Sequence, residues 1–262
     1  MKNRFTATVI AALLVGCAGD TSQSTPDDYL YYEVFMDDSA SGKTMVVFLH
    51  GDSGRDGVPG RASRYMFHQA RKFADRYQGE AIGVGMLRPG YRDRDGNRSP
   101  GTPSQIDDDK TPRKNAEVAR SVAHLKELYD AENVIGVGHS GGAAMLGSII
   151  GQRPDLFDAV VLVSVACDIP RSRRHRSGRN RWVLSQSPKD FVDTVSPDIV
   201  IRAISGENDN NVLSHHATDC VKAYQDRGIN AEAIIVAGAG HTRGLLPVMQ
   251  RELDKLLQEG ML

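Results

Sequence analysis

The chain has 262 residues, of which 40% are hydrophobic and 25% are charged, and its formal net charge at pH 7 is -1. These values indicate an ordinary globular protein with a sizeable core and argue against a disordered or fibrous one. Because the net charge is close to zero, no global field draws the protein to nucleic acid or to an anionic surface, and any such attraction has to be local.

The N-terminal segment has the pattern of a signal peptide. Basic residues precede an apolar run, Phe5 to Val15, which is too short to span a bilayer and ends in small residues. The end of this segment, Leu14-Val15-Gly16-Cys17, resembles the lipobox of bacterial lipoproteins. That resemblance implies a signal peptide over residues 1–16, acylation of Cys17 and export to the cell envelope, with Ala18 favouring the outer membrane on its periplasmic side. An ordinary signal peptide cut elsewhere is the alternative.

Residues 17–28 are rich in small and polar side chains and cannot bury enough surface to fold, so they read as a tether to a domain over residues 29–262. Two further cysteines, Cys167 and Cys220, could pair in an oxidising periplasm, but the sequence does not give their separation, so a disulfide is left open. Neither cysteine lies in the strand-turn-helix setting of a catalytic thiol.

From residue 29 onward, short runs rich in Val and Ile alternate with longer amphipathic segments, which is the pattern of βαβ units and a mainly parallel sheet. The predicted strands are Met45–His50, Ala81–Leu87, Val134–His139, Ala159–Val165, Ile199–Ser205 and Ala231–Ala237, with Tyr29–Met36 as an antiparallel edge. The predicted helices are Ala62–Tyr77, Arg113–Tyr129, Gly142–Gln152, Ser214–Asp226 and Leu245–Gln258.

Two stretches interrupt this alternation, and loops of such length are usually functional or disordered. The first, 89–112, contains Gly-Tyr-Arg-Asp and Asp-Gly-Asn turn sequences. The second, 167–197, is rich in arginine and contains Arg171, Arg173, Arg174, Arg176, Arg179 and Arg181.

The strongest chemical motif is Gly138-His139-Ser140-Gly141-Gly142, which follows a predicted strand and precedes a predicted helix. Small residues on both sides allow a sharp turn that exposes the serine hydroxyl, and the helix directs backbone N–H groups at a developing oxyanion. Strand, motif and helix together resemble the α/β-hydrolase superfamily. The resemblance implies an α/β fold, with a mostly parallel central sheet flanked by helices, and Ser140 as the nucleophile.

In that superfamily the chain order is nucleophile, acid and histidine. Asp209 follows the apolar run 199–204 in a polar turn that resembles the family's acid turn, and His241 follows the next apolar run on a glycine-rich loop. The resemblance implies that His241 is the general base and that Asp209 orients its ring. Glu207, in the same turn as Asp209, is the alternative acid.

The segment Val46–Gly54 resembles the strand and His-Gly sequence that supplies the second oxyanion donor. That donor is a backbone N–H group, placed at Asp52 or alternatively at Ser53, and it pairs with the N–H group of Gly141. His50 and His139 are expected to support the neighbouring backbone instead of exchanging protons. The other histidines form no convincing metal cluster, so no metal and no cofactor is expected.

By its place in the chain, the segment 167–197 corresponds to the connection between the sixth and seventh strands of the α/β-hydrolase superfamily, where lids are inserted. It is short for a lid. Arg173 and Arg174 are candidate contacts to an acidic substrate or a phospholipid head group, because guanidinium groups bind carboxylate and phosphate. A solvated loop without a ligand is the alternative. The sequence 88–91 and the turn at 206–212 also resemble the catalytic domain of prolyl-oligopeptidase-type peptidases, and Tyr91 is a further candidate contact.

The sequence therefore predicts a serine hydrolase that cleaves carboxylic esters, small or polymeric, through an acyl-enzyme. A peptidase or amidase of the same fold is the alternative, and acyl transfer to an alcohol would use the same residues. A catalytically silent binding lipoprotein is the third possibility, since fold does not guarantee activity, but the complete set of Ser140, Asp209 and His241 argues against it. A monomer that contacts the membrane through its anchor, with no nucleic-acid partner, is expected.

Overall fold

The computed structural model of the protein describes residues 28–37, 44–52, 62–101 and 109–261. The predicted signal peptide, the acylation site Cys17 and almost all of the predicted tether lie outside the described residues, as does Ser53. These expectations, and the division of the chain that they imply, stay predictions. In the described part of the chain, no helix has both the length and the apolar character needed to cross a membrane.

Seven strands form one sheet in the order β1-β3-β2-β4-β5-β6-β7. β1 pairs antiparallel with β3, and every other neighbouring pair is parallel. The predicted mainly parallel sheet is therefore confirmed, and each predicted parallel strand agrees to within two residues at either end. The strands are β1 (Tyr32–Phe35), β2 (Thr44–Leu49), β3 (Ala81–Met86), β4 (Asn133–His139), β5 (Ala159–Val163), β6 (Val200–Gly206) and β7 (Asn230–Val236).

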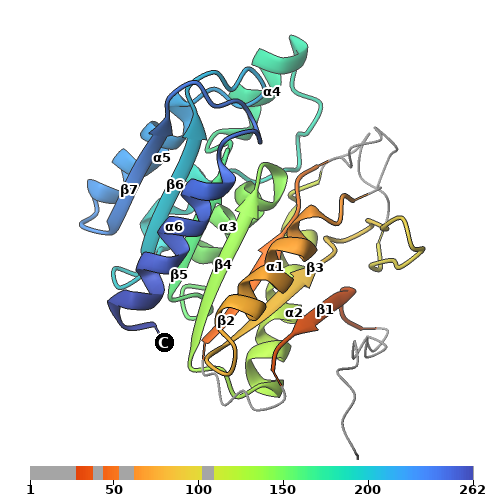
Figure 1. Ribbon diagram of the computed structural model, residues 1–262. Coiled ribbons are helices and arrows are strands. Elements are labelled where there is room, and N and C mark those ends of the chain that lie inside the picture. The colour runs from red at the N-terminus through yellow and green to blue at the C-terminus, as the bar shows by residue number, and fades with distance from the viewer. Residues whose placement is uncertain (1–27, 38–43, 53–61, 102–108, 262) are drawn as a thin grey trace, which may run out of the picture.

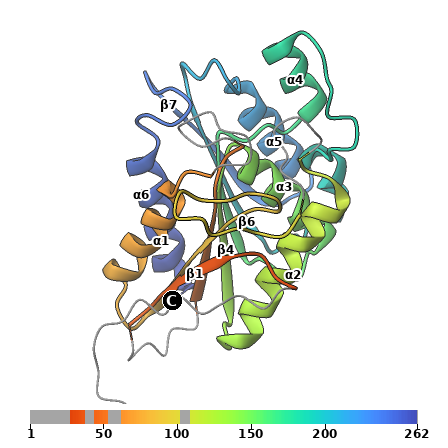
Figure 2. The ribbon, with the colours of Figure 1, turned by 90° about the vertical axis from the view of Figure 1, so that its right-hand side faces the viewer.

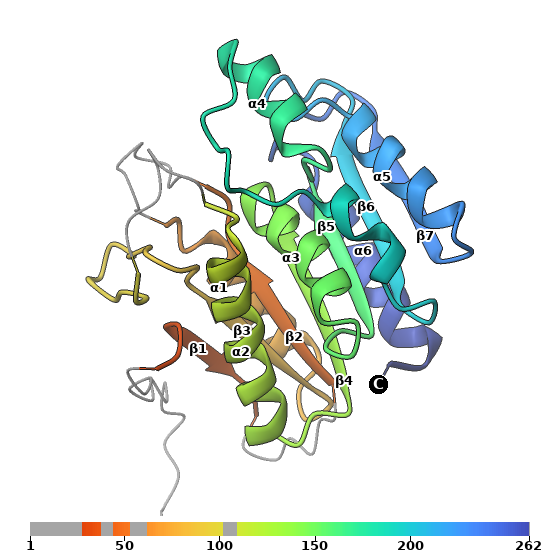
Figure 3. The ribbon, with the colours of Figure 1, turned by 180° about the vertical axis from the view of Figure 1, so that it is seen from behind.

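Helices cover both faces of the sheet and give three layers (Figures 1, 2 and 3). α1 (Tyr65–Arg76) and α6 (Leu246–Leu256) lie on one face, and the chain continues from α6 into a short π-helical turn, η2 (Leu257–Met261). The opposite face carries α2 (Pro112–Leu128), α3 (Gly141–Gln152) and α5 (His215–Gln225).

The two helical layers explain why the central strands are apolar without interruption. In β2, Met45, Val47 and Leu49 join the core under α2, α3 and α5, whereas Val46 and Phe48 join the core under α1 and α6. Successive side chains of a strand point to opposite faces, so a strand covered on both sides needs apolar residues at every position.

The arginine-rich segment, predicted as a small lid-like insertion with no helix assigned to it, contains two short helices. It lies between β5 and β6 and forms α4 (Ile169–Ser177) and a 3₁₀-helix, η1 (Pro188–Thr194). Asp168 caps α4 by accepting a hydrogen bond from the N–H of Arg171, and Gly178 ends the helix at a φ of 68°. The α4 sequence lacks an apolar stripe, which is why periodicity missed it. α4 projects at the end of the sheet where the parallel strands finish (Figures 1 and 3).

Candidate active site

The carboxyl ends of three parallel strands bring the predicted triad together. Ser140 follows β4, Asp209 follows β6 and His241 follows β7. Nε2 of His241 lies 3.0 Å from Oγ of Ser140, and Nδ1–H of His241 donates to Oδ2 of Asp209 at 2.8 Å. This chain of hydrogen bonds is the arrangement that the sequence predicts for a nucleophile, a base and an acid.

The turn that presents Ser140 is strained and depends on its glycines. Ser140 has φ 53° and ψ -111°, values that a residue with a side chain adopts only when its surroundings enforce them. A Cβ on Gly138 would lie 2.6 Å from the backbone nitrogen of Ala143, and one on Gly142 would lie 2.6 Å from the carbonyl oxygen of Leu49. Both positions therefore require glycine, because β4 and β2 approach the start of α3 too closely for a side chain.

Asp209 is buried, and both of its carboxylate oxygens accept hydrogen bonds. Its Oδ1 accepts the backbone N–H groups of Asn211 and Val212, each at 2.9 Å. Burial raises the pKa of Asp209, but the hydrogen bonds from His241 and from the two N–H groups outweigh it and hold that pKa below its usual value. Glu207, the alternative acid, is exposed and instead accepts the N–H of Gly238 at 2.9 Å. The geometry therefore selects Asp209.

The turn after β6 and the loop after β7 pack directly on each other. The N–H of Glu207 donates to the carbonyl oxygen of Val236 at 3.0 Å, and the N–H of Asn208 donates to that of Ala239 at 2.8 Å. A side chain on Gly206 would overlap the carbonyl oxygen of Ala239. These backbone contacts hold the turn that carries Asp209 against the loop that carries His241.

Two side chains hold the backbone of His241. Oγ of Ser164 and Nε2 of His139 each donate to the carbonyl oxygen of His241 at 3.0 Å. Burial, with the neighbouring His241 as the second cause, lowers the pKa of His139 to about 4, so its ring stays neutral at neutral pH. His139 therefore supports backbone, as expected from the sequence, but the backbone that it holds is that of His241, and neither this contact nor that of Ser164 was predicted.

The residues of the two predicted oxyanion donors, Asp52 and Gly141, lie next to each other. Gly141 is the first residue of α3, where N–H groups have no partner within the helix, and Asp52 follows β2. In the described residues, neither N–H group has an acceptor. Both are therefore available to an oxyanion formed next to Ser140.

A buried ion network holds the Asp52 segment. Oδ1 of Asp52 accepts from Nζ of Lys110 at 2.6 Å and from Nη2 of Arg88 at 3.0 Å, and Arg88 also reaches Asp109 at 2.9 Å. Burial opposes ionisation of Asp52, but the charges of Lys110 and Arg88 outweigh burial and keep its pKa well below the usual range. Sequence patterns missed this network because its members are distant in the chain.

Tyr91 belongs to that network and not to the substrate surface. It is fully buried, its hydroxyl accepts from Nη2 of Arg88 at 2.8 Å, and it donates to the carbonyl oxygen of Asp52. The prediction that Tyr91 contacts substrate is wrong, because no part of its side chain reaches solvent.

His50 supports the same segment. Its Nδ1–H donates to the carbonyl oxygen of Gly51, and its Nε2 accepts the N–H of Arg88. Burial and the charge of Arg88 lower the pKa of His50 to about 3.

A cleft of about 810 Å³ opens onto Ser140 and His241. Nδ2 of Asn211, which also lines the cleft, lies 2.9 Å from Nε2 of His241, a contact that only its place two residues after Asp209 could have indicated. The other side chains that line the cleft come mainly from the start of α1 and the turns after β2 and β3, and include His50, Asp52, Arg64, Tyr65, His68, Arg94, Asp95, His139, Arg176 and Thr242.

The two arginines predicted to contact substrate occupy different positions. Arg174 is exposed, and neither Arg173 nor Arg174 is among the residues that line the cleft, so their predicted contact with substrate stays a prediction. Arg173 is partly buried, with its guanidinium 3.9 Å from the ring centroid of Trp182. Arg176, one turn after Arg173, is the arginine of α4 that lines the cleft. Among the described residues, no group of three or more His, Cys, Asp or Glu side chains could hold a metal ion.

The model of the prolyl oligopeptidase family, Peptidase_S9, matches residues 109–258, which include Ser140, Asp209 and His241. The chain belongs to the prolyl oligopeptidase family. The predicted resemblance to this family's catalytic domain is thereby confirmed. A prolyl endopeptidase of Dictyostelium discoideum is 31% identical over 118 residues, which span 38% of this chain but only 15% of that relative.

Solved structures of both esterases and peptidases are similar to this member of the prolyl oligopeptidase family. Est1E from Butyrivibrio proteoclasticus, with ferulic acid bound, has a TM-score of 0.64 at 16% identity and covers 87% of this chain and 94% of its own. Esterase PE8 has a TM-score of 0.61 at 17% identity, with 86% and 99% covered. An acylaminoacyl peptidase from Pyrococcus horikoshii has a TM-score of 0.65 at 15% identity, with 88% and 38% covered. These similarities confirm the α/β-hydrolase fold.

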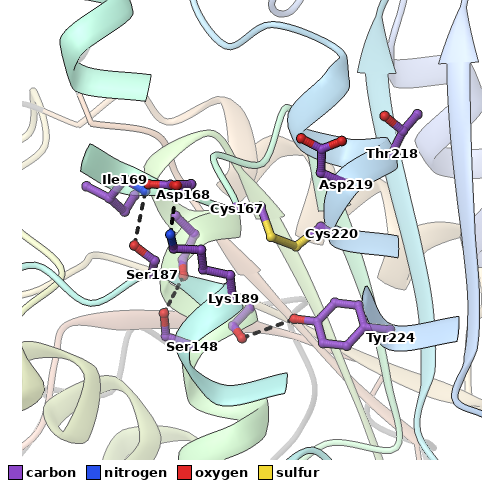
Figure 4. The surroundings of a disulfide bond; sticks show 12 residues. Ser148, Cys167, Asp168, Ile169, Ser187, Lys189, Thr218, Asp219, Cys220 and Tyr224 are labelled. Carbon is purple, nitrogen blue, oxygen red and sulfur yellow. Dashed lines mark hydrogen bonds and ion pairs between the residues drawn. A yellow bond between two sulfur atoms is a disulfide. The ribbon is translucent and has the colours of Figure 1, made fainter. Parts of the chain in front are cut away.

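A disulfide between Cys167 and Cys220 joins the start of the arginine-rich segment to α5 (Figure 4). It answers the question that the sequence left open; the two Cα atoms are 5.6 Å apart. Around it, Nζ of Lys189 donates to Asp168 at 2.8 Å, and Oγ of Ser187 accepts the N–H of Ile169 at 3.1 Å. In this member of the prolyl oligopeptidase family, the base of α4 is therefore fixed both covalently and by hydrogen bonds.

Proposed function

We propose that the protein is a serine hydrolase that cleaves carboxylic esters through an acyl-enzyme. The observation that carries the proposal is the hydrogen-bonded chain from Asp209 through His241 to Ser140, which opens onto the cleft of about 810 Å³. A cleft of this size suits a small organic ester or the end of a longer one.

The reaction follows from the positions of the proton donors and acceptors. Nε2 of His241 takes the proton of Ser140 as Oγ attacks the carbonyl carbon, and it returns that proton to the leaving alcohol. Asp209 stabilises the imidazolium that forms in between. A water molecule activated by His241 then releases the acid in the same way.

The N–H groups of Asp52 and Gly141 are proposed to stabilise the tetrahedral intermediate. One such donor is worth about 3 kcal/mol in the transition state. The buried pairing of Asp52 with Arg88 and Lys110 supports this role, because it fixes the backbone before the substrate arrives.

The similarity to two esterases supports an ester substrate, since they are matched over 94% and 99% of their own chains with TM-scores of 0.64 and 0.61. A peptidase of the same fold is the second candidate, and the family match over residues 109–258 supports it.

Labelling with a fluorophosphonate probe tests the serine hydrolase proposal. We expect covalent labelling of the folded protein that disappears in Ser140→Ala. A panel of 4-nitrophenyl esters and aminoacyl 4-nitroanilides then ranks ester against amide cleavage, and faster hydrolysis of the amides would replace the esterase proposal by the peptidase. No labelling of a folded protein would favour the silent binding protein.

We also propose that the protein is exported and anchored by acylation of Cys17, on the periplasmic side of the outer membrane. The disulfide between Cys167 and Cys220 supports export, because such bonds persist in oxidising compartments. Metabolic labelling with an alkyne fatty acid is expected to mark the protein and to fail in Cys17→Ser. Labelling that persists in the variant would exclude this anchor.

A further inference from the structure

The carboxylates that line the cleft are already paired. Asp52 contacts Lys110 and Arg88, and Asp95 contacts Arg64 at 3.2 Å. The two buried histidines at the cleft, His50 and His139, have lowered pKa values and are neutral near pH 7. The described carboxylates of the cleft therefore leave none free to pair with a further cation there.

Arg176 is such a cation. It lines the cleft, and among the described residues its guanidinium has neither a carboxylate partner nor a hydrogen-bond acceptor. It lies one turn after Arg173 on α4, so two guanidinium groups project from the same side of the helix.

Arg173 is also short of acceptors. Its Nε is buried and, in the part of the chain that the structure describes, has no hydrogen-bond partner, although its guanidinium stacks on Trp182. Burial and the charge of Arg176 lower the pKa of Arg173, whereas the charge of Asp52 raises it. Leaving a buried guanidinium nitrogen without an acceptor is unfavourable, and so is holding two like charges one turn apart.

Trp182 connects this pair to the reaction centre. Nζ of Lys110 lies 4.0 Å from the centroid of the ring on which Arg173 stacks, and the same Nζ holds Asp52. Together with the disulfide at its base, this contact fixes α4 relative to Ser140. Arg173 and Arg176 therefore lie on a helix that these contacts hold in place.

We propose that Arg176, together with Arg173, forms a subsite that binds an anionic group, a carboxylate or a phosphate, of the substrate held at Ser140. A planar guanidinium binds either oxyanion through paired hydrogen bonds. The inference rests on the proposed function for the reaction, but the subsite itself is a binding property that can be measured without turnover.

The kinetic test compares 4-nitrophenyl butyrate with mono-4-nitrophenyl glutarate, which adds a carboxylate to the acyl chain. In Arg176→Gln, we expect the ratio of kcat/KM for the glutarate ester to that for the butyrate ester to fall at least about tenfold, the effect of one charge-assisted hydrogen bond. Arg179→Gln, with the same charge change on an exposed residue outside the cleft lining, is the matched control and should keep the ratio. An equal ratio in Arg176→Gln and the unmodified protein overturns the proposal.

The binding test uses Ser140→Ala and calorimetry with glutarate and with inorganic phosphate. We expect at least one of the two anions to bind, with a Kd raised about tenfold or more by Arg176→Gln and unchanged by Arg179→Gln; the anion that binds more tightly identifies carboxylate or phosphate as the recognised group. No binding of either anion, or equal affinity in both variants, overturns the subsite. Failure of the proposed function differs, because neither ester would be turned over and Ser140 would not be labelled while binding could still be measured.

Discussion

The carboxylate of Asp52 lies against the Cα of Gly141, in the space that a Cβ at residue 141 would occupy. Nη1 of Arg88 lies 2.5 Å from the same point. The ion pair between Asp52 and Arg88 therefore requires glycine at residue 141, directly after Ser140. The segment at Asp52 and the start of α3 can pack this closely only when residue 141 is glycine.

Gly141→Ala is expected to lower kcat/KM at least about a hundredfold, the effect of losing one oxyanion donor, because the new methyl group displaces the Asp52–Arg88 pair. Gly240→Ala is the matched control. It changes a glycine next to His241 where a Cβ meets nothing within 4 Å and φ is not positive. Ester hydrolysis by purified, folded variants measures both effects, and similar losses in the two variants would contradict this account.

Asp209→Asn is expected to lower kcat about ten-thousand-fold, because an amide cannot hold His241 in the required tautomer or stabilise its cation. Glu207→Gln removes the neighbouring carboxylate, which is exposed and bonds only to the N–H of Gly238 among its described contacts. Its kcat should stay within about twofold of the unmodified value. Turnover rates of the two variants distinguish the acids, and the reverse order would reassign the role to Glu207.

Loss of the disulfide is expected to lower the free energy of unfolding by about 4 kcal/mol, the loop-closure entropy for cysteines 53 residues apart. The measurement is urea denaturation of Cys167→Ala/Cys220→Ala. The unmodified protein, unfolded with and without reductant, is the control, and reductant should have no effect on the double variant. A double variant as stable as the unmodified protein would show that the hydrogen bonds around α4 suffice.

The protein should lose stability as the pH falls below 6.5. Burial, with His215 and Arg171 as further causes, lowers the pKa of His216 to about 4 in the native state, whereas an unfolded histidine titrates near 6.5. Between these values the unfolded chain binds a proton that the native protein does not, so this contribution falls with falling pH and is lost by about pH 4. From pH 7 to pH 5 it amounts to roughly 2 kcal/mol.

His216→Leu removes that proton-binding group from the unfolded chain. Its free energy of unfolding should therefore decline less between pH 7 and pH 5, by roughly the same 2 kcal/mol. Chemical denaturation at several pH values measures the difference. Parallel curves for the variant and the unmodified protein would mean that His216 has the same pKa in the native and the unfolded state.

The sheet and the triad could be predicted because each rests on local patterns. Strands such as β4 are short apolar runs bounded by turns, and Ser140 lies in a motif whose glycines are all within two residues of it. Asp209 and His241 follow strand ends, which parallel pairing brings to one edge of the sheet.

What the sequence could not provide depends on contacts between distant segments. Asp52 is 36 residues from Arg88 and 58 from Lys110, and no periodicity links them. Tyr91 looked like a surface residue in a turn but completes that buried network. α4 was not predicted because its many arginines leave it without an apolar face, although Asp168 and Gly178 are residue types that often cap helices.

The direct packing of the turn at Gly206 against the loop at Ala239 has a consequence for how this site tolerates change. Main-chain contacts hold Asp209 and His241 together, with the side chains of Ser164 and His139 as further supports, and none of these contacts comes from the arginine-bearing helix. Substitutions on α4 can therefore alter which molecules are accepted while the proton-transfer pair stays intact. Substrate specificity can therefore change while Asp209 and His241 keep their positions.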